Sequence, residues 1–240
     1  MGPRRKNKTA GWRRYRPPSR GWEGAPGQES MQGLAGVRKT VAYYLTDLPV
    51  RLLAKTPVSP NTLSWLGFIL AVGAATLVGW GYLLAAGFVV LFAGFLDILD
   101  GALARRTNRV SRFGAVLDAT LDRASEAALL LGILALFLLS SEQPLLFASI
   151  AREWSVVLVF IALLGSVLVS YIRARAETLS VDCQIGLFTR GERVIVLVLG
   201  LFLNQITEWA LPAALAIILA FSAITVVQRL VHVWQQTKNR

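Results

Sequence analysis

The sequence has little cysteine, histidine or charge. Among 240 residues there is one cysteine, Cys183, and one histidine, His232, and only 16% of residues are charged. A single cysteine excludes an internal disulfide, and we interpret it as structural. His232 has no cysteine, histidine or carboxylate partner at ligand spacing, which argues against a histidine-based metal site. The low charge, with 55% hydrophobic residues, is far from soluble composition and indicates a membrane protein.

Six apolar stretches, bounded by polar or turn residues, follow one another along the chain. A helix needs about 20 mostly apolar residues to cross the hydrocarbon core of a bilayer. We therefore predict an all-α integral membrane fold with six transmembrane helices, of which the fifth is short. The predicted spans are Thr62 to Gly79, Tyr82 to Ala104, Phe113 to Leu139, Trp154 to Ala174, Val194 to Asn204 and Trp209 to Val231.

Acidic residues are also few, 14 against 25 Lys and Arg, for a net charge of +11. The basic residues gather in residues 1–60 and around the links after the second and fourth predicted spans, whereas the alternate links carry only Arg152. Since Lys and Arg accumulate in cytoplasmic loops, we expect a multi-pass protein of the cytoplasmic (plasma) membrane with both termini in the cytoplasm. This segregation, without a nucleic-acid-binding motif, favours anionic lipid over nucleic acid as the partner.

The chain divides by composition into three segments. Residues 1–33 are rich in Arg, Gly, Pro and Ser without apolar periodicity, which predicts a disordered basic arm. Residues 34–56 place apolar residues at three- and four-residue spacing among charged ones, which predicts an interfacial amphipathic helix beside the membrane. Residues 57–240 then form one six-helix membrane domain.

Four aspartates lie in the second and third predicted spans, where a central charge costs at least about 2.5 kcal/mol. Asp97 and Asp100 are three residues apart and Asp118 and Asp122 four apart, so each pair shares a helix face. An antiparallel hairpin turning near Arg109 would bring all four to one depth near the cytoplasmic surface. Because close carboxylates need a cation, and Mg²⁺ prefers carboxylate and phosphate oxygens, the pattern predicts a divalent metal site facing the cytoplasm.

Two other interpretations of the aspartates stay open. They could pair with Arg105, Arg112 and Arg123 at the helix ends, or bind the coupling cation of a small membrane transporter. Transporter sites favour the bilayer midplane and corresponding motifs in two halves of the chain. These carboxylates lie toward one side on a single hairpin, which favours an enzyme.

The spacing of the aspartates resembles the signature of the CDP-alcohol phosphotransferase family, in which an acceptor hydroxyl displaces CMP from a CDP-linked donor. The resemblance includes Pro60-Asn61-Thr62 before the first span and the six-span layout, over roughly residues 57 to 235. The matching string is Asp97-x-x-Asp100-Gly101-x-x-Ala104-Arg105, eight residues, then Gly114-x-x-x-Asp118-x-x-x-Asp122.

This resemblance implies a homodimer that uses CDP-diacylglycerol and two divalent ions per site, Mg²⁺ or alternatively Mn²⁺. The metal ligands would be Asp97, Asp100, Asp118 and Asp122. Asp122 would also be the catalytic base that takes the proton of the acceptor hydroxyl. The donor would be bound by Pro60, Thr62, Asp97, Asp100, Gly101, Ala104, Arg105, Ser111, Gly114 and Asp118.

The identity of the acceptor depends on residues beside and beyond this motif. Ala119 and Arg123, after the third and fourth aspartates, are similar to phosphatidylinositol-phosphate synthases, whereas phosphatidylglycerophosphate synthases have Pro and Lys there. The likeness implies transfer to inositol phosphate, with the acceptor phosphate bound by Ser170, Arg173 and Arg193, since guanidinium groups suit phosphate. Arg229 is a further candidate. Glycerol 3-phosphate stays open as the acceptor, and the positive-inside rule alone would also explain these arginines.

Overall fold

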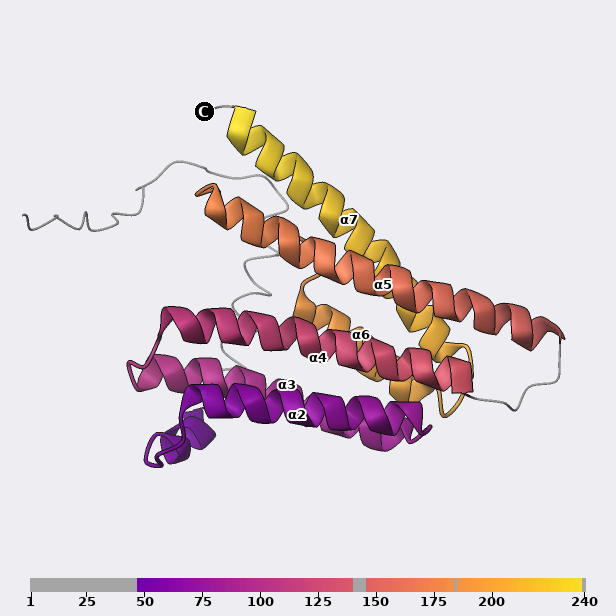
Figure 1. Ribbon diagram of the computed structural model, residues 1–240, viewed down its shortest axis with the longest axis horizontal. Helices are drawn as coiled ribbons and strands as arrows, with labels where there is room; N and C mark the ends of the chain where they lie inside the picture. Colours follow the sequence, from indigo (N-terminus) through magenta and orange to yellow (C-terminus); the bar gives the residue numbers. More distant parts are fainter. Residues whose placement is uncertain (1–46, 140–145, 184, 239–240) are drawn as a thin grey trace, which may run out of the picture. The chain divides into compact units, whose positions relative to one another are not determined.

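The computed structural model describes residues 47–139, 146–183 and 185–238, and for residues 146–152 only the backbone. The predicted basic arm and most of the predicted amphipathic helix lie outside the described residues. All regular structure within the described ranges is helical, with no strand (Figure 1). A short helix over residues 47–53 is followed by α2 (Pro60–Gly79), α3 (Leu83–Arg106), α4 (Arg112–Leu139), α5 (Leu146–Thr178), α6 (Arg190–Leu203) and α7 (Ala210–Lys238).

Each predicted span corresponds to one of the helices α2 to α7. In the described part of the chain, four helices are long and apolar enough to cross a membrane: Pro60–Gly79, Leu83–Arg106, Glu153–Thr178 and Ala210–Lys238. α4 falls outside this group because charged residues crowd its first half, and α6 because it has only 14 residues. The structure therefore supports a helical membrane protein with four candidate spans, and the prediction of six stays a prediction.

The helix ends that matter for the site are fixed by local hydrogen bonds. Ser59 caps α2, since its Oγ accepts from the backbone N–H of Thr62 at 3.2 Å. Glu192 caps α6, because its Oε2 accepts from the backbone N–H of Thr189 at 2.7 Å. The α3–α4 turn passes through Asn108 with φ 52°, a left-handed conformation that asparagine tolerates. The two caps fix where α2 and α6 begin.

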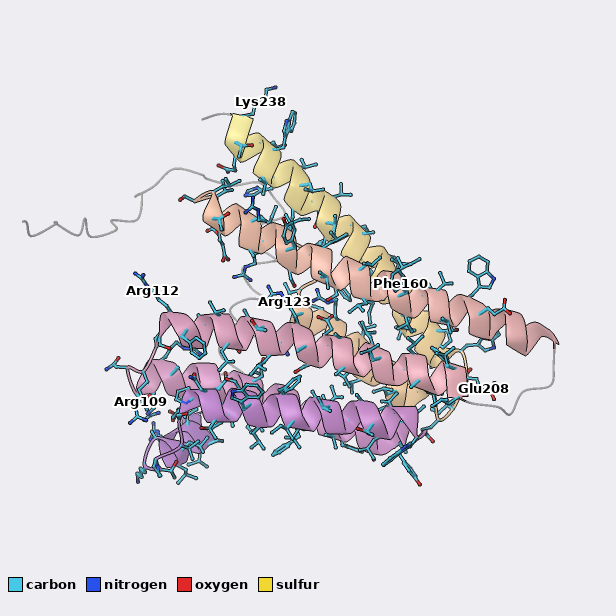
Figure 2. The ribbon with its side chains drawn as sticks, in the orientation of Figure 1. Arg109, Arg112, Arg123, Phe160, Glu208 and Lys238 are labelled. Atoms are coloured by element: carbon cyan, nitrogen blue, oxygen red, sulfur yellow. The ribbon has the colours of Figure 1, made fainter. Side chains whose placement is uncertain are left out.

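Helices α2, α3 and α4 pack side by side, α5 packs on α7 and α4, and α6 packs on α7 and α3 (Figure 1). A Cβ at Gly132 of α4 would lie 2.3 Å from the carbonyl oxygen of Ala75 in α2, so only glycine permits this approach. Arg109 and Arg112 lie at the α3–α4 turn, and Glu208 lies at the opposite end of the helices (Figure 2). As predicted, α3 and α4 run antiparallel on either side of their turn, but the helix that packs against both of them is α2.

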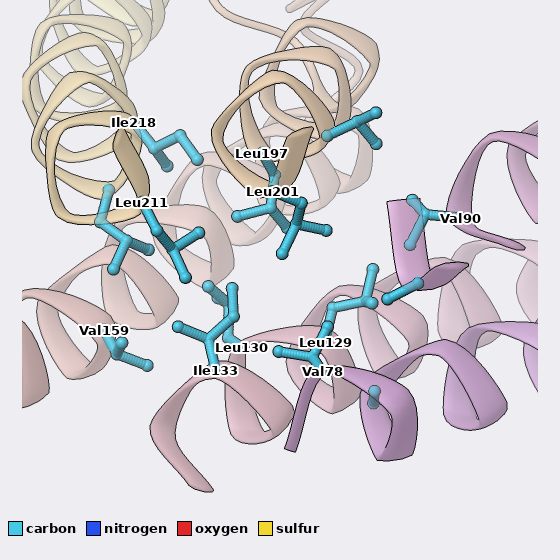
Figure 3. Packing of buried hydrophobic residues seen from close by; sticks show 14 of the residues in the cluster. Val78, Val90, Leu129, Leu130, Ile133, Val159, Leu197, Leu201, Leu211 and Ile218 are labelled. Atoms are coloured by element: carbon cyan, nitrogen blue, oxygen red, sulfur yellow. The ribbon is translucent and has the colours of Figure 1, made fainter. Parts of the chain in front are cut away.

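The largest apolar cluster occupies the half of the bundle away from the α3–α4 turn, and a smaller one, which includes Leu63 and Leu103, lies toward that turn. The largest cluster joins Val78 of α2, Val90 of α3, Ile133 of α4 and Leu201 of α6, with Leu211 of α7 (Figure 3). The aspartates lie in the last three turns of α3 and the first half of α4, next to this cluster rather than in it. Large apolar side chains also face outward, as expected for helices that contact lipid: Ile69, Phe88, Leu131, Phe160 and Ile224.

Candidate active site

Three of the four aspartates form one carboxylate group. One carboxylate oxygen each from Asp97, Asp100 and Asp118 lie within 4.8 Å of one another. Asp100 is buried, and Asp97 and Asp118 are partly exposed. Three hard oxygen donors at this separation fit a divalent cation of the Mg²⁺ or Mn²⁺ kind, whose remaining positions would be filled by water and phosphate oxygens. The prediction that the hairpin gathers the aspartates is confirmed for these three.

The fourth aspartate, Asp122, joins this group through an arginine. Arg190 Nη1 lies 2.8 Å from Asp97 Oδ2 and 2.5 Å from Asp122 Oδ1. Arg190 Nε is buried and has no hydrogen-bond partner among the described residues. The aspartates do pair with an arginine, but it comes from α6 and not from the helix ends of the hairpin.

Asp100 is held from α2. Ser64 Oγ donates to Asp100 Oδ2 at 2.5 Å, and Ser64 stands one turn after Pro60 at the start of that helix. A hydrogen bond to a carboxylate oxygen fixes its rotamer without removing its charge. Sequence reasoning assigned Ser64 no role, because nothing in the spacing relates it to a residue on the next helix.

Of the two glycines predicted to bind the donor, Gly114 lies at a close approach. A Cβ at Gly114 would lie 2.9 Å from Ser111 Oγ and 3.3 Å from Asn61 Oδ1, so the start of α2 reaches the start of α4 here. Ser111 Oγ also accepts from the backbone N–H of Gly114 at 2.9 Å. On α3, a Cβ at Gly101 would lie 3.4 Å from Arg105 Nη1, so the guanidinium lies over the glycine.

The other predicted donor residues lie around these glycines. Pro60 and Thr62 flank Asn61 in the first turn of α2, and Thr62 Oγ1 lies 2.8 Å from Ser59 Oγ. Ala104 is half-buried on α3, one turn after Asp100. The predicted donor residues of α2, α3 and α4 therefore come from the ends of the helices that lie toward the α3–α4 turn.

Arg193 is the most firmly held of the predicted acceptor residues. Its Nε and Nη2 donate to the two carboxylate oxygens of Glu126 at 2.6 and 2.9 Å, and the side chains are only 3% and 8% exposed. Its Nη1 is buried without a hydrogen-bond partner within the described ranges. Glu126 lies four residues after Asp122, on the same face of α4. Sequence reasoning missed it, although the spacing 118, 122, 126 was a signal.

The remaining acceptor candidates come from α5 and α7. Ser170 is half-buried on α5, and the exposed Arg173 pairs through Nε with Glu177 at 3.0 Å. Arg229 of α7 is buried and donates through Nη1 to the carbonyl of Val169, next to Ser170, at 2.5 Å. Arg173 and Arg193 both lie close enough to Arg229 to repel its charge. These arginines of three helices therefore lie near one another, and Glu126 and Glu177 neutralise two of them.

Cys183 lies near Arg173 and Arg229, and His232 lies on α7. Burial raises the pKa of the Cys183 thiol, which keeps it protonated and unreactive. His232 Nε2 lies 3.1 Å from the carbonyl oxygen of Asp182.

Comparison with known proteins defines the class of this site. Residues 57–228 match the CDP-alcohol phosphatidyltransferase family, and the chain belongs to that family. It is therefore a phosphotransferase, which removes the transporter interpretation. The carboxylate group of α3 and α4 coincides with the motif that predicted the family from sequence.

Individual relatives narrow the class. The chain is 34% identical over 173 residues to archaetidylinositol phosphate synthase of Methanothermobacter thermautotrophicus, covering 72% of this chain and 81% of that protein. It is 36% identical over 196 residues to phosphatidylinositol phosphate synthase of Mycobacterium tuberculosis, covering 79% and 86%. The crystal structure of the Mycobacterium tuberculosis enzyme with CDP-DAG bound has a TM-score of 0.69 and 33% identity, covering 80% of this chain and 94% of that one. Its complex with manganese and citrate has a TM-score of 0.69 and 34% identity, covering 79% and 88%.

Proposed function

We propose that the chain transfers a phosphatidyl group from CDP-diacylglycerol to a hydroxyl of inositol phosphate, giving phosphatidylinositol phosphate and CMP. The observation that carries this proposal is the carboxylate group of Asp97, Asp100 and Asp118 in a chain of this family. The synthases that it resembles at 34% and 36% identity both have inositol phosphate in their product names, which supports the acceptor. The solved relative with CDP-DAG supports the donor.

Asp97, Asp100 and Asp118 hold the metal, for which Mg²⁺ is the proposed ion, two per site, and Mn²⁺ the alternative. When bound, the metal neutralises the donor diphosphate and stabilises CMP as the leaving group. Ser64 keeps the Asp100 carboxylate in the rotamer that faces the other two. Gly101 and Gly114 let the nucleotide approach the helix backbones, and Arg105 pairs with a phosphate oxygen.

The transfer is a displacement at the phosphorus that carries the diacylglycerol. The acceptor hydroxyl oxygen forms the new P–O bond, the bond from that phosphorus to the CMP oxygen breaks, and CMP leaves with the bonding electron pair. Asp122 takes the proton of the hydroxyl as general base. The contact of Arg190 with both Asp97 and Asp122 supports a position for Asp122 next to the proposed metal.

The acceptor phosphate binds to Ser170, Arg173 and Arg193. Arg193 is fixed by Glu126, yet keeps Nη1 without a partner among the described residues, so one donor is available to a phosphate oxygen. Nearby Arg229 donates to backbone carbonyls and has no carboxylate partner among the described residues, so it adds positive charge. A phosphate is the natural counter-ion for such a region.

The membrane arrangement completes the proposal. α4 and α6 cross together with the four apolar helices, giving six spans in a plasma-membrane homodimer with both termini in the cytoplasm. The arginine-rich α3–α4 turn and the aspartates near it then face the cytoplasm, where CDP heads and inositol phosphate are soluble. In the helix over residues 47–53, Leu48 and Leu52 are exposed while Asp47 pairs with Arg106 of α3 at 2.9 Å, which supports an amphipathic helix along the membrane surface.

The acceptor is tested by supplying purified protein with CDP-diacylglycerol and Mg²⁺ and one acceptor at a time. We expect CMP release with inositol phosphate to be at least about tenfold faster than with glycerol 3-phosphate or free inositol, because the latter leaves the arginines without an anion. Nucleotide chromatography measures CMP, and lipid mass spectrometry identifies the product. CMP release with glycerol 3-phosphate but not inositol phosphate would overturn the assignment.

A further inference from the structure

We propose that Arg190 is the built-in counter-ion of the carboxylate cluster and competes with divalent metal for Asp97, so that this residue lowers the affinity of the site for metal. The inference rests on the proposed function only in taking Asp97, Asp100 and Asp118 as metal ligands. Arg190 acts here as a positioning residue, through the aspartates.

A single nitrogen of Arg190 lies between carboxylates of two helices. Arg190 Nη1 bridges Asp97 of α3 at 2.8 Å and Asp122 of α4 at 2.5 Å, with all three side chains 24–32% exposed. The cation between these carboxylates is therefore supplied by the chain itself. Asp97 belongs to both arrangements, because it is also one of the three carboxylates of the metal group.

The two cations cannot both be held strongly by Asp97. A divalent ion at the three carboxylates would lie close to the guanidinium, and like charges at such a separation repel, more strongly at partly buried sites than in water. Asp97 Oδ2 also cannot give its full charge to Arg190 and to a metal together. Metal binding must therefore weaken or break the contact of Arg190 with Asp97.

Arg190 contacts its carboxylates through one nitrogen, whereas Arg193 uses two. Arg190 is the first residue of α6 and reaches both aspartates through Nη1, while Nε is buried without a hydrogen-bond partner in the described part of the chain. Arg193, one turn later, is bound to Glu126 by two nitrogens and is only 3% exposed. The Glu126 pair and the Glu192 cap hold α6 in place, so the side chain of Arg190 can move without the helix.

The consequence is that the carboxylates keep a counter-ion at every stage. Without such a cation, close carboxylates would repel one another and destabilise the ends of α3 and α4 that carry them. With Arg190 present, the metal must displace the guanidinium from Asp97, so it binds less tightly and reversibly. Removing the guanidinium should thus strengthen metal binding and lower the stability of the metal-free protein.

The test is a Mn²⁺ titration of the purified full chain in detergent, after chelation and without donor or acceptor, followed by calorimetry and by the electron paramagnetic resonance of free Mn²⁺. Arg190→Gln should lower the Kd of the tightest site by about tenfold or more. Arg190→Lys, which keeps the charge but not the fork, should lower it by about threefold. Arg175→Gln removes the same charge from an exposed position on α5 and should leave the Kd unchanged.

Thermal unfolding supplies a second measurement. Arg190→Gln should lower Tm in the absence of Mn²⁺ and show a larger rise in Tm than the wild type when Mn²⁺ is added, which a purely structural role would not produce. A Kd for Arg190→Gln that is unchanged or higher overturns the inference; if that variant does not fold, an unchanged or higher Kd for Arg190→Lys does so. Because no substrate is present, tighter Mn²⁺ binding without CMP release in any assay would sink the proposed function and leave this inference standing.

Discussion

Asp122→Asn is expected to lower the rate of CMP release by about 10²–10⁴-fold, because an amide cannot take the proton of the acceptor hydroxyl. The protein should remain folded, since the amide oxygen still accepts from Arg190 and Arg190 keeps its contact with Asp97 at 2.8 Å. The rate is measured on purified protein with saturating CDP-diacylglycerol, inositol phosphate and Mg²⁺. Unfolding temperature is recorded on the same samples.

Asp182→Asn is the matched control for this substitution, because Asp182 is exposed and lies outside the carboxylate cluster. It should retain the wild-type rate. The Mn²⁺ affinity of Asp122→Asn distinguishes a role of Asp122 as base from a role as metal ligand. Loss of a base lowers the rate with little change in the Kd for Mn²⁺, whereas loss of a ligand raises that Kd. A near wild-type rate, or a loss of affinity as large as the loss of rate, would contradict the role of Asp122 as the base.

Removal of metal is expected to reduce CMP release to background. The three carboxylates of Asp97, Asp100 and Asp118 attract a divalent ion but repel the diphosphate of the donor, so without metal the donor lacks both charge neutralisation and a stabilised leaving group. Treatment with a chelator followed by gel filtration should abolish activity, and added Mg²⁺ or Mn²⁺ should restore it. The measurement is CMP release against metal concentration.

Asp100→Asn applies the same removal and restoration of metal to a variant that lacks one proposed metal ligand. Asp100 is buried and accepts a hydrogen bond from Ser64 at 2.5 Å, so the amide keeps the contact with α2 but loses the negative charge. We expect restoration by metal to need a much higher concentration or to fail, while Asp182→Asn responds like the wild type. CMP release that persists in protein shown to be free of divalent metal would refute the metal-dependent mechanism.

The carboxylate group could be predicted from sequence because its members belong to one hairpin. Spacings of three and four residues fix a shared helix face, and equal distances from the turn near Arg109 fix a shared depth. Both arguments use only local geometry. The same logic found the centres of the helices, because apolar runs mark the part of each helix that the membrane contacts.

The helix ends were predicted less well where helices continue beyond the apolar runs. The fourth predicted span, Trp154 to Ala174, lies within α5, which extends over Leu146–Thr178, and α7 continues to Lys238 beyond the predicted Val231. Backbone hydrogen bonding does not stop at the edge of the hydrocarbon layer, whereas hydropathy does. The apolar pattern therefore marks the span and not the helix.

The partners of the aspartates could not be predicted, because they lie far along the chain. Arg190 is 93 residues from Asp97, and Ser64 is 36 residues from Asp100. Arg193 and Glu126 are 67 residues apart. Such pairs depend on how α2 and α6 pack against the hairpin, and periodicity within one helix carries no information about that packing.

The most direct test of the metal site is to locate Mn²⁺ by anomalous diffraction in crystals of the full chain grown with CDP-diacylglycerol. We predict an anomalous peak within coordination distance of the carboxylates of Asp97, Asp100 and Asp118, against the donor diphosphate. An ordered Mn²⁺ bound elsewhere, with the donor diphosphate away from these three carboxylates, would contradict the account.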